Sequence, residues 1–182
     1  DGSDVSPFTP ILAKEVRAGT YAPRDPRALD RVLQYMDALE SQGRYVLMVW
    51  PVHCVIGSWG HGVHADVHAA CDDWQVKRRT AVRNVFKGMN PWTEHYSAIR
   101  AEVPDREDPE TDVNDRLLRE LAKADRLLVA GEASSHCVRS TVEDIVNHLP
   151  KLSPEWTASR VVLLTDCMSP VGGFEREQVA FR

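Results

Sequence analysis

Four amphipathic helix patterns alternate with four short apolar runs, and this alternation constrains the fold more than any other feature of the sequence. The helix patterns cover 29–39, 63–74, 113–124 and 138–149, and the apolar runs cover 45–49, 82–86, 127–130 and 161–164. Apolar residues that recur every three or four positions indicate a helix with one buried face, and short apolar runs bounded by turn residues indicate buried strands. Strands joined through helices run parallel and are covered by those helices. The sequence therefore predicts an α/β fold, a doubly wound parallel sheet with helices on both faces.

The ends of the helix patterns carry recognisable capping residues. Asp25 can accept hydrogen bonds from free N–H groups of the first helix, with Pro26 at its first position. Thr111 or Asp112 is the predicted cap of the third helix. Pro150 is predicted to end the fourth helix, because proline lacks the N–H that a helix interior needs.

Two stretches show neither pattern. Residues 1–24 include several prolines without sustained periodicity and are predicted to be a loop or linker. Residues 88–110 are acidic and contain prolines, so a long ordered loop or lid is predicted there, not a packed element.

Composition narrows the class of protein. The 182 residues, 43% hydrophobic and 27% charged, predict one globular domain over 1–182. A net charge of -5 gives no reason to expect a nucleic-acid partner. No run approaches the roughly 20 apolar residues of a membrane span, and the start resembles no signal peptide, so we expect no membrane partner and a cytoplasmic location. The four irregularly spaced cysteines predict free thiols, not a disulfide framework or a structural zinc site.

Three segments are expected to meet at one edge of the sheet. In open parallel sheets the functional crevice lies beyond the carboxyl ends of the strands. The segments WPVHC (50–54), FKG (86–88) and GEASSHC (131–137) each follow a predicted strand. This edge is therefore the predicted site.

Cys137 and Lys87 are the candidate catalytic residues. Cys137 opens a helix, whose positive end and unpaired N–H groups favour a thiolate and can stabilise an oxyanion. Lys87 ends a predicted strand, from which its ammonium can reach the crevice and support the thiolate. The alternatives are an inert buried cysteine and a solvated lysine.

Histidines offer a second kind of chemistry. His53 lies just past a predicted strand and is a candidate metal ligand or substrate contact, although one histidine does not make a metal site. His61, His64 and His68 have helical spacing, and a solvated helix face is favoured over a zinc cluster.

Taken together, WPVHCVIGSWG, VFKG and GEASSHCVRSTVEDIV resemble the nicotinamidase branch of the isochorismatase-like cysteine hydrolases, over roughly residues 45–166. The resemblance implies a Rossmann-like three-layer fold with an Asp, Lys, Cys triad at the sheet edge. Cys137 matches the nucleophile and Lys87 the lysine. The family's oxyanion hole uses the N–H of the nucleophile and of a residue after a cis peptide, which corresponds to Ala133 after Glu132.

The resemblance also implies a divalent metal, with zinc the expected ion, and His53 matches one of its ligands. The triad aspartate and the other ligands have no match in this sequence. Asp66 and His68 form an Asp-x-His string, but they follow His53 where the family's pair precedes it. The family's first strand has no match either. We therefore expect the 182 residues to be a segment of a longer chain.

The predicted function is a cysteine-dependent amidohydrolase of NAD metabolism, converting an aromatic carboxamide such as nicotinamide to the acid and ammonia through a thioester. The alternatives are another hydrolase of the family, acting on a different amide, a carbamoyl group or an enol ether, and a non-catalytic binding protein on the same fold. Trp92, His95 and Tyr96 are candidate pocket residues because they lie in the long loop after Lys87. The family resemblance leads us to expect a homo-oligomer.

Overall fold

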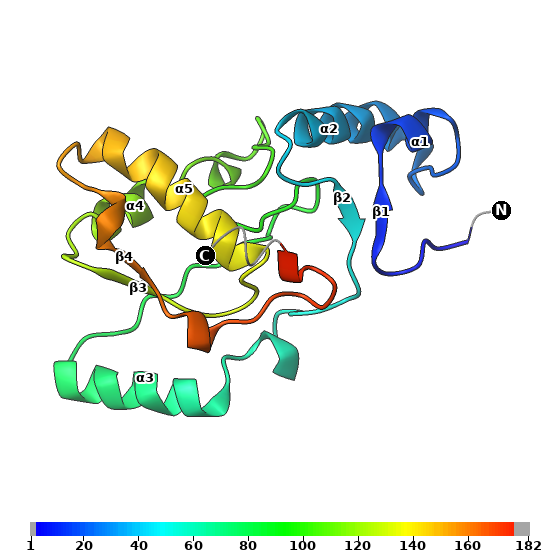
Figure 1. Ribbon diagram of the computed structural model, residues 1–182. Coiled ribbons are helices and arrows are strands. Elements are labelled where there is room, and N and C mark those ends of the chain that lie inside the picture. The colour runs from blue at the N-terminus through cyan, green and yellow to red at the C-terminus, as the bar shows by residue number, and fades with distance from the viewer. Residues whose placement is uncertain (1–2, 177–182) are drawn as a thin grey trace. The chain divides into compact units, whose positions relative to one another are not determined.

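The structure, a computed structural model, describes residues 3–176. Contacts within the chain divide it into two compact units, residues 1–85 (unit 1) and residues 86–182 (unit 2), and each is described by itself. Both units combine helices with a two-stranded sheet, so the predicted mixture of helix and strand is confirmed (Figure 1). The assignment of the whole chain to one domain stays a prediction.

Unit 1 is built on a short antiparallel sheet. β1 (Thr9–Ile11) pairs with β2 (Leu47–Val49), and helices α1 (Ala13–Arg17) and α2 (Leu29–Ser41) pack beside them. The buried core residues of this unit come from β1, α1 and α2: Ile11, Ala13, Val16 and Met36. The prediction of a loop over 1–24 is wrong for residues 9–17, which form β1 and α1. A three-residue strand and a five-residue helix are too short to show a period in the sequence.

The start of α2 follows the predicted capping. The Asp25 carboxylate accepts a hydrogen bond from the Arg27 N–H at 3.0 Å, and Pro26 opens a 3₁₀ turn (Pro26–Ala28) that leads directly into α2. Met36 and Leu39, one turn apart, are each 1% exposed. The helix predicted over 29–39 is therefore confirmed.

The second half of unit 1 differs from the prediction. Helix α3 (Ala65–Arg78) is where a helix was expected, after a 3₁₀ turn (Trp59–His61), but none of its residues is buried. No strand forms over 82–86. The Val82 N–H donates to the Gln75 side chain at 2.9 Å, and Val85 and Phe86 are exposed. An apolar run becomes a strand only with a partner for its backbone, and no described strand pairs with this one.

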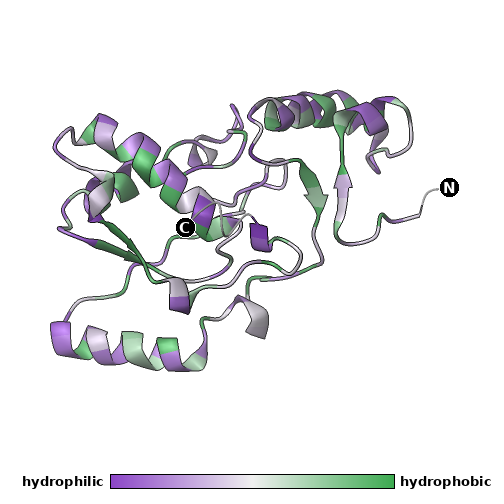
Figure 2. Ribbon diagram, in the orientation of Figure 1, coloured by the Kyte–Doolittle hydropathy of each residue, from purple (hydrophilic) through white to green (hydrophobic). Residues whose placement is uncertain are grey.

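Unit 2 holds a parallel strand pair under a long amphipathic helix. β3 (Leu127–Val129) lies parallel to β4 (Val161–Leu163), as expected, and α5 (Cys137–Leu152) connects them. α4 (Asp115–Leu121) packs on α5. The main buried apolar cluster takes its residues from α4, α5, β3 and two loops: Ile99, Leu118, Leu127, Ile145, Leu149 and Trp156. Figure 2 shows the alternation of hydrophobic and hydrophilic residues along α5 and the apolar character of β3 and β4.

Two predicted helix ends in unit 2 are wrong. Asn114 caps α4, because its side-chain oxygen accepts from the Leu117 N–H at 2.9 Å, whereas Thr111 closes a separate 3₁₀ turn (Pro109–Thr111). Pro150 does not end α5, which continues to Leu152. The missing N–H of Pro150 costs one bond near the end of the helix, and the Ser153 N–H donates to the Leu149 carbonyl at 2.9 Å to finish the last turn. Two further 3₁₀ turns (Ala158–Arg160 and Thr165–Cys167) flank β4.

The segment 88–110 is irregular, as predicted, but it is packed. Ser97 and Ala101 are fully buried, and Ile99 belongs to the main apolar cluster of unit 2. Its backbone is held by neighbouring backbone groups: the Ala101 N–H donates to Thr111 and the Asn114 N–H donates to Ile99, at 2.9 and 2.7 Å. The prediction of an unpacked loop or lid is therefore wrong for its central residues.

The predicted single parallel sheet is not found among residues 3–176. The described strands form two separate two-stranded sheets, one antiparallel and one parallel. The prediction is wrong for two reasons: β2 pairs with β1 in an antiparallel sheet, and residues 82–86 do not form the strand that was expected between β2 and β3 in the chain. No described helix is long and apolar enough to cross a membrane.

A matched pair of leucines tests the core of unit 2. Leu149 is fully buried on α5, whereas Leu128 on β3 is 66% exposed. We expect Leu149→Ala to lower the free energy of unfolding by about 2–5 kcal/mol, because it removes buried methyl groups and leaves a cavity. Leu128→Ala should cost much less. Urea denaturation of both variants measures this, and equal losses would contradict the assigned core.

Candidate active site

Cys137 is the first residue of α5 and is half-buried. The first backbone N–H groups of a helix have no partner within the helix, and the positive end of the helix dipole lies beside them. The start of a helix can therefore stabilise negative charge on a neighbouring group. All four cysteines are free, as the sequence predicted, so Cys137 is not held in a disulfide.

Lys87 reaches the sulfur of Cys137. Its Nζ lies 3.6 Å from Cys137 Sγ and donates a hydrogen bond to the His95 carbonyl at 2.8 Å. Lys87 does not end a strand, as the sequence suggested, but lies in the irregular segment after 82–86. Its side chain is exposed, yet its ammonium has two specific partners. The two residues, 50 positions apart, are thus brought together within unit 2.

The turn before Cys137 contains the expected cis peptide, between Glu132 and Ala133. Gly131 has a φ of 118°, a conformation that residues with a side chain rarely adopt. The Ala133 carbonyl accepts from the N–H groups of His136 and Val138, both at 3.1 Å. These bonds fold the turn back onto the first residues of α5.

Residues 167–171 hold this turn from the other side. The Gly131 N–H donates to the Cys167 carbonyl at 3.0 Å, and the Ser134 N–H donates to the Ser169 carbonyl at 2.8 Å. In the opposite direction, the Ser169 N–H donates to the Glu132 carboxylate at 3.1 Å, and the Val171 N–H donates to the Ser135 hydroxyl at 2.9 Å. Four hydrogen bonds therefore fix the backbone that leads into Cys137.

Two backbone N–H groups of the segment that leads into Cys137 matter for the expected oxyanion hole. Within residues 3–176, neither the Ala133 N–H nor the Cys137 N–H donates a hydrogen bond. Neighbouring amides of the same turn, at Ser134, His136 and Val138, are all paired. Preorganised N–H groups without a partner are what an oxyanion hole requires.

His95 contributes a neutral side chain next to this pair. Burial, and after it the nearby Lys87 ammonium, lowers the pKa of His95 from 6.5 to about 4, against the smaller individual effects of the Asp108 and Asp144 carboxylates, which raise it. Its imidazole is therefore uncharged at neutral pH. Among the candidate pocket residues, His95 contacts Lys87 through its carbonyl oxygen.

The other two pocket candidates are placed differently. Tyr96 is 7% exposed, and its ring centroid lies 5.6 Å from that of His136. The Trp92 side chain is 42% exposed, and its backbone N–H donates to Asn90. Neither has a described hydrogen bond to Cys137 or Lys87. Their role at the site stays a prediction.

His53 lies in unit 1 and is exposed. Its Nδ1 is 2.6 Å from the Pro51 carbonyl, so Nδ1 carries the proton and Nε2 is the nitrogen that could bind a metal. A catalytic zinc takes three protein ligands, and no group of three His, Cys, Asp or Glu side chains suited to a metal occurs within residues 3–176. The described residues therefore supply at most one part of the expected metal site.

His61, His64 and His68 are exposed, as expected, but only His68 lies within a helix, and His61 belongs to the 3₁₀ turn before α3. His64 caps α3, its Nδ1 accepting from the Asp66 N–H at 3.3 Å, and His68 lies 3.1 Å from Asp72. All of these side chains are exposed.

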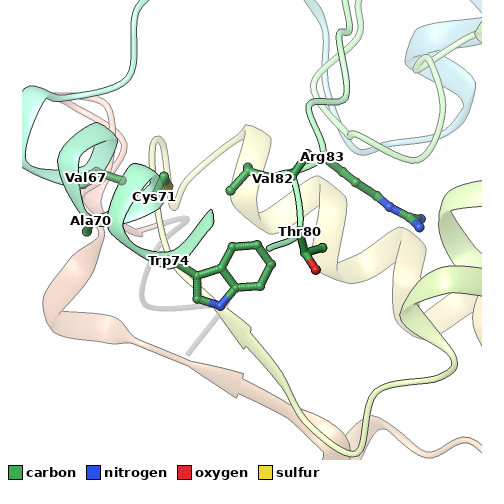
Figure 3. A pocket seen from close by; sticks show the side chains of 8 residues that line it. Val67, Ala70, Cys71, Trp74, Thr80, Val82 and Arg83 are labelled. Atoms are coloured by element: carbon green, nitrogen blue, oxygen red, sulfur yellow. The ribbon is translucent and has the colours of Figure 1, made fainter. Parts of the chain in front are cut away.

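Unit 1 also contains an open apolar cavity of about 480 Å³ between α3 and residues 80–83 (Figure 3). The Trp74 indole and the Val82 side chain face this space, and the Arg83 side chain extends away from it. None of the predicted site residues lines it; its walls are Val67, Ala70, Cys71, Trp74, Thr80, Ala81, Val82 and Arg83.

Sequence reasoning missed the residues that support the turn and the nucleophile. Glu132 and Ser135 bind residues 167–171, and Thr141 binds both Cys137 and Ala98. Only Thr141 had a signal in the sequence, since a residue four positions after Cys137 lies on the same face of a helix.

No family model and no curated protein matches this chain. Among solved structures, two of the yeast nicotinamidase Pnc1p match it. One has 22% sequence identity, a TM-score of 0.47 and coverage of 74% of this chain and 53% of that chain. The other, bound to the inhibitor nicotinaldehyde, has 19% identity, a TM-score of 0.49 and coverage of 75% and 56%. This chain thus spans about half the length of those proteins.

We predict that His95 makes stability depend on pH. Because its pKa in the folded state, about 4, lies below its ordinary value of 6.5, the unfolded chain binds the proton first as the pH falls. This contribution to the free energy of unfolding is fully present above pH 6.5 and is lost progressively down to about pH 4. His95→Asn should flatten that dependence. Urea unfolding across this window measures it, and an unchanged slope in the variant would contradict the assignment.

Proposed function

We propose that this chain carries the nucleophile of a cysteine-dependent amidohydrolase, nicotinamidase-like, that converts an aromatic carboxamide such as nicotinamide to the acid and ammonia. The observation that carries the proposal is the 3.6 Å contact between Lys87 Nζ and Cys137 Sγ at the start of α5. The sequence resemblance in WPVHC, FKG and GEASSHC supports the same chemistry.

The first step is attack by sulfur on the carboxamide carbon. The Lys87 ammonium and the N-terminal end of α5 stabilise the thiolate of Cys137. As the carbon becomes tetrahedral, its oxygen gains negative charge and accepts hydrogen bonds from the N–H groups of Ala133 and Cys137. These donors need no reorganisation, because residues 167–171 hold the turn in place before substrate binds.

Collapse of the tetrahedral intermediate breaks the carbon–nitrogen bond. The nitrogen takes up the proton that the thiol gave to a general base, which the family resemblance assigns to an aspartate, and leaves as ammonia. The product is a thioester on Cys137. Water then attacks its carbonyl carbon, with the same two N–H groups stabilising the oxyanion, to release the acid and restore the thiol.

A divalent metal, zinc by expectation, remains part of the proposal through His53. Its Nε2 is the nitrogen available for coordination. A bound metal would polarise or orient the substrate. Because the described residues do not complete a site of three ligands, no step above depends on it. A cytoplasmic location and homo-oligomeric assembly are proposed on the family resemblance.

Replacing the nucleophile tests the proposal. We expect Cys137→Ala to reduce ammonia release from nicotinamide by roughly a thousandfold or more, because alanine has no sulfur with which to form the thioester. Cys167→Ala, which removes an exposed free cysteine of the same unit, is the matched control and should retain activity. If Cys137→Ala keeps its activity, the proposal is wrong. If wild type and Cys167→Ala release no ammonia from nicotinamide while their Cys137 still reacts with iodoacetamide, the substrate is another amide, a carbamoyl group or an enol ether.

The metal is tested separately through His53. We expect a chelator to lower ammonia release and His53→Ala to weaken the retention of metal, measured by elemental analysis after dialysis. His61→Ala, on an exposed histidine of the same unit, is the control. Equal metal content in wild type and His53→Ala would remove His53 from the metal site.

A further inference from the structure

We propose that Thr141 is a positioning residue that keeps Lys87 beside Cys137, acting through the backbone of residues 95–98. The inference rests on the proposed function in that Lys87 and Cys137 are its working pair. Thr141 lies on α5, one turn after Cys137, and nothing in the proposed mechanism uses it.

The Thr141 hydroxyl joins two segments that are distant in sequence. It donates a hydrogen bond to the Cys137 carbonyl at 2.7 Å and accepts one from the Ala98 N–H at 3.0 Å. Three residues before Ala98, the His95 carbonyl accepts from Lys87 Nζ at 2.8 Å. The contacts therefore run in a closed circuit from Cys137 through Thr141, Ala98, His95 and Lys87 back to the Cys137 sulfur at 3.6 Å.

The short segment 95–98 is stiff enough to transmit this constraint. Tyr96 and Ser97 are 7% and 0% exposed, and Ile99 is anchored in the apolar core of unit 2. The Ser97 hydroxyl accepts from the Ile99 N–H at 3.0 Å, which fixes the local turn. The His95 carbonyl, which lies on this segment, is therefore fixed in position. Because the Lys87 ammonium donates to that carbonyl, its position depends on how residues 95–98 are bound to α5.

A hydroxyl is required for both bonds. Threonine has one O–H to donate, which goes to the Cys137 carbonyl, and a lone pair that receives the Ala98 N–H. A threonine that binds the carbonyl four residues earlier is ordinary in helices and by itself has no functional meaning. The second bond, to a backbone N–H 43 residues away, is what couples α5 to the segment that holds Lys87.

Valine has the shape of threonine without the hydroxyl, so Thr141→Val removes both bonds and leaves the Ala98 N–H unpaired. Thr141→Ser keeps the hydroxyl. Ser41→Ala is the control for loss of an ordinary helix hydroxyl, because Ser41 donates only to the Ala38 carbonyl, at 2.8 Å, in unit 1. If Thr141→Val does not fold, Thr141→Ala removes the same hydroxyl with less volume.

The experiment follows alkylation of Cys137 by iodoacetamide as a function of pH, without substrate, beside the urea unfolding of each variant. We expect Thr141→Val to react about tenfold more slowly at neutral pH and to need a higher pH for half-maximal rate, since its lysine is no longer held at the sulfur. Thr141→Ser and Ser41→Ala should follow wild type. A folded Thr141→Val variant with the wild-type pH profile, or a Thr141→Ser variant as slow as valine, would overturn the proposal.

This readout separates the inference from the proposed function. Slower alkylation of Thr141→Val would support the positioning role even if the protein hydrolyses no amide. The absence of amide hydrolysis would contradict the proposed amidohydrolase function. If nicotinamide is a substrate, the kcat of Thr141→Val should fall in parallel with its rate of alkylation. Its KM should stay near the wild-type value, because Thr141 acts on the nucleophile and not on substrate binding.

Discussion

The contact between the Lys87 ammonium and the Cys137 sulfur is the interaction on which the rest of the site depends. Lys87 does not lie at a strand end, whereas Cys137 follows the turn after β3. Cys137 is placed because α5 packs its apolar face, including the fully buried Leu149, on the core of unit 2. Lys87 is placed because an irregular but buried segment offers it the His95 carbonyl. The pair therefore owes its geometry to packing of the helix and of the loop on one core.

Around this pair the backbone is arranged to stabilise charge. In the turn before α5, the N–H groups of Gly131, Ser134 and His136 donate hydrogen bonds within the turn or to residues 167–171, whereas those of Ala133 and Cys137 have no acceptor among the described residues. In the proposed mechanism, a cation stabilises the thiolate before the reaction, and two amides stabilise the oxyanion during it. Acyl transfer by a thiol requires both a stabilised thiolate and a stabilised oxyanion.

Some of this could be predicted from the sequence. The parallel pair β3 and β4, the helix that begins at Cys137, and Cys137 and Lys87 as candidates all followed from periodicity, helix-start chemistry and family resemblance. The predictions of a strand over 82–86 and of a loop over 1–24 were wrong because pairing with a distant part of the chain, not the local sequence pattern, decides whether a short apolar run becomes a strand. The burial of the segment around Ile99 was not predicted because it depends on tertiary contacts with α4 and α5. No periodic pattern in the local sequence indicates such contacts.

The most direct test of the account is the pH dependence of Cys137 alkylation in wild type and in Lys87→Met. Methionine keeps the length and apolar stem of lysine without its charge. If the ammonium stabilises the thiolate, the variant should need a distinctly higher pH for half-maximal reaction, with the maximal rate retained. Superimposable profiles in two equally folded proteins would mean that the Lys87 ammonium does not act on the Cys137 sulfur.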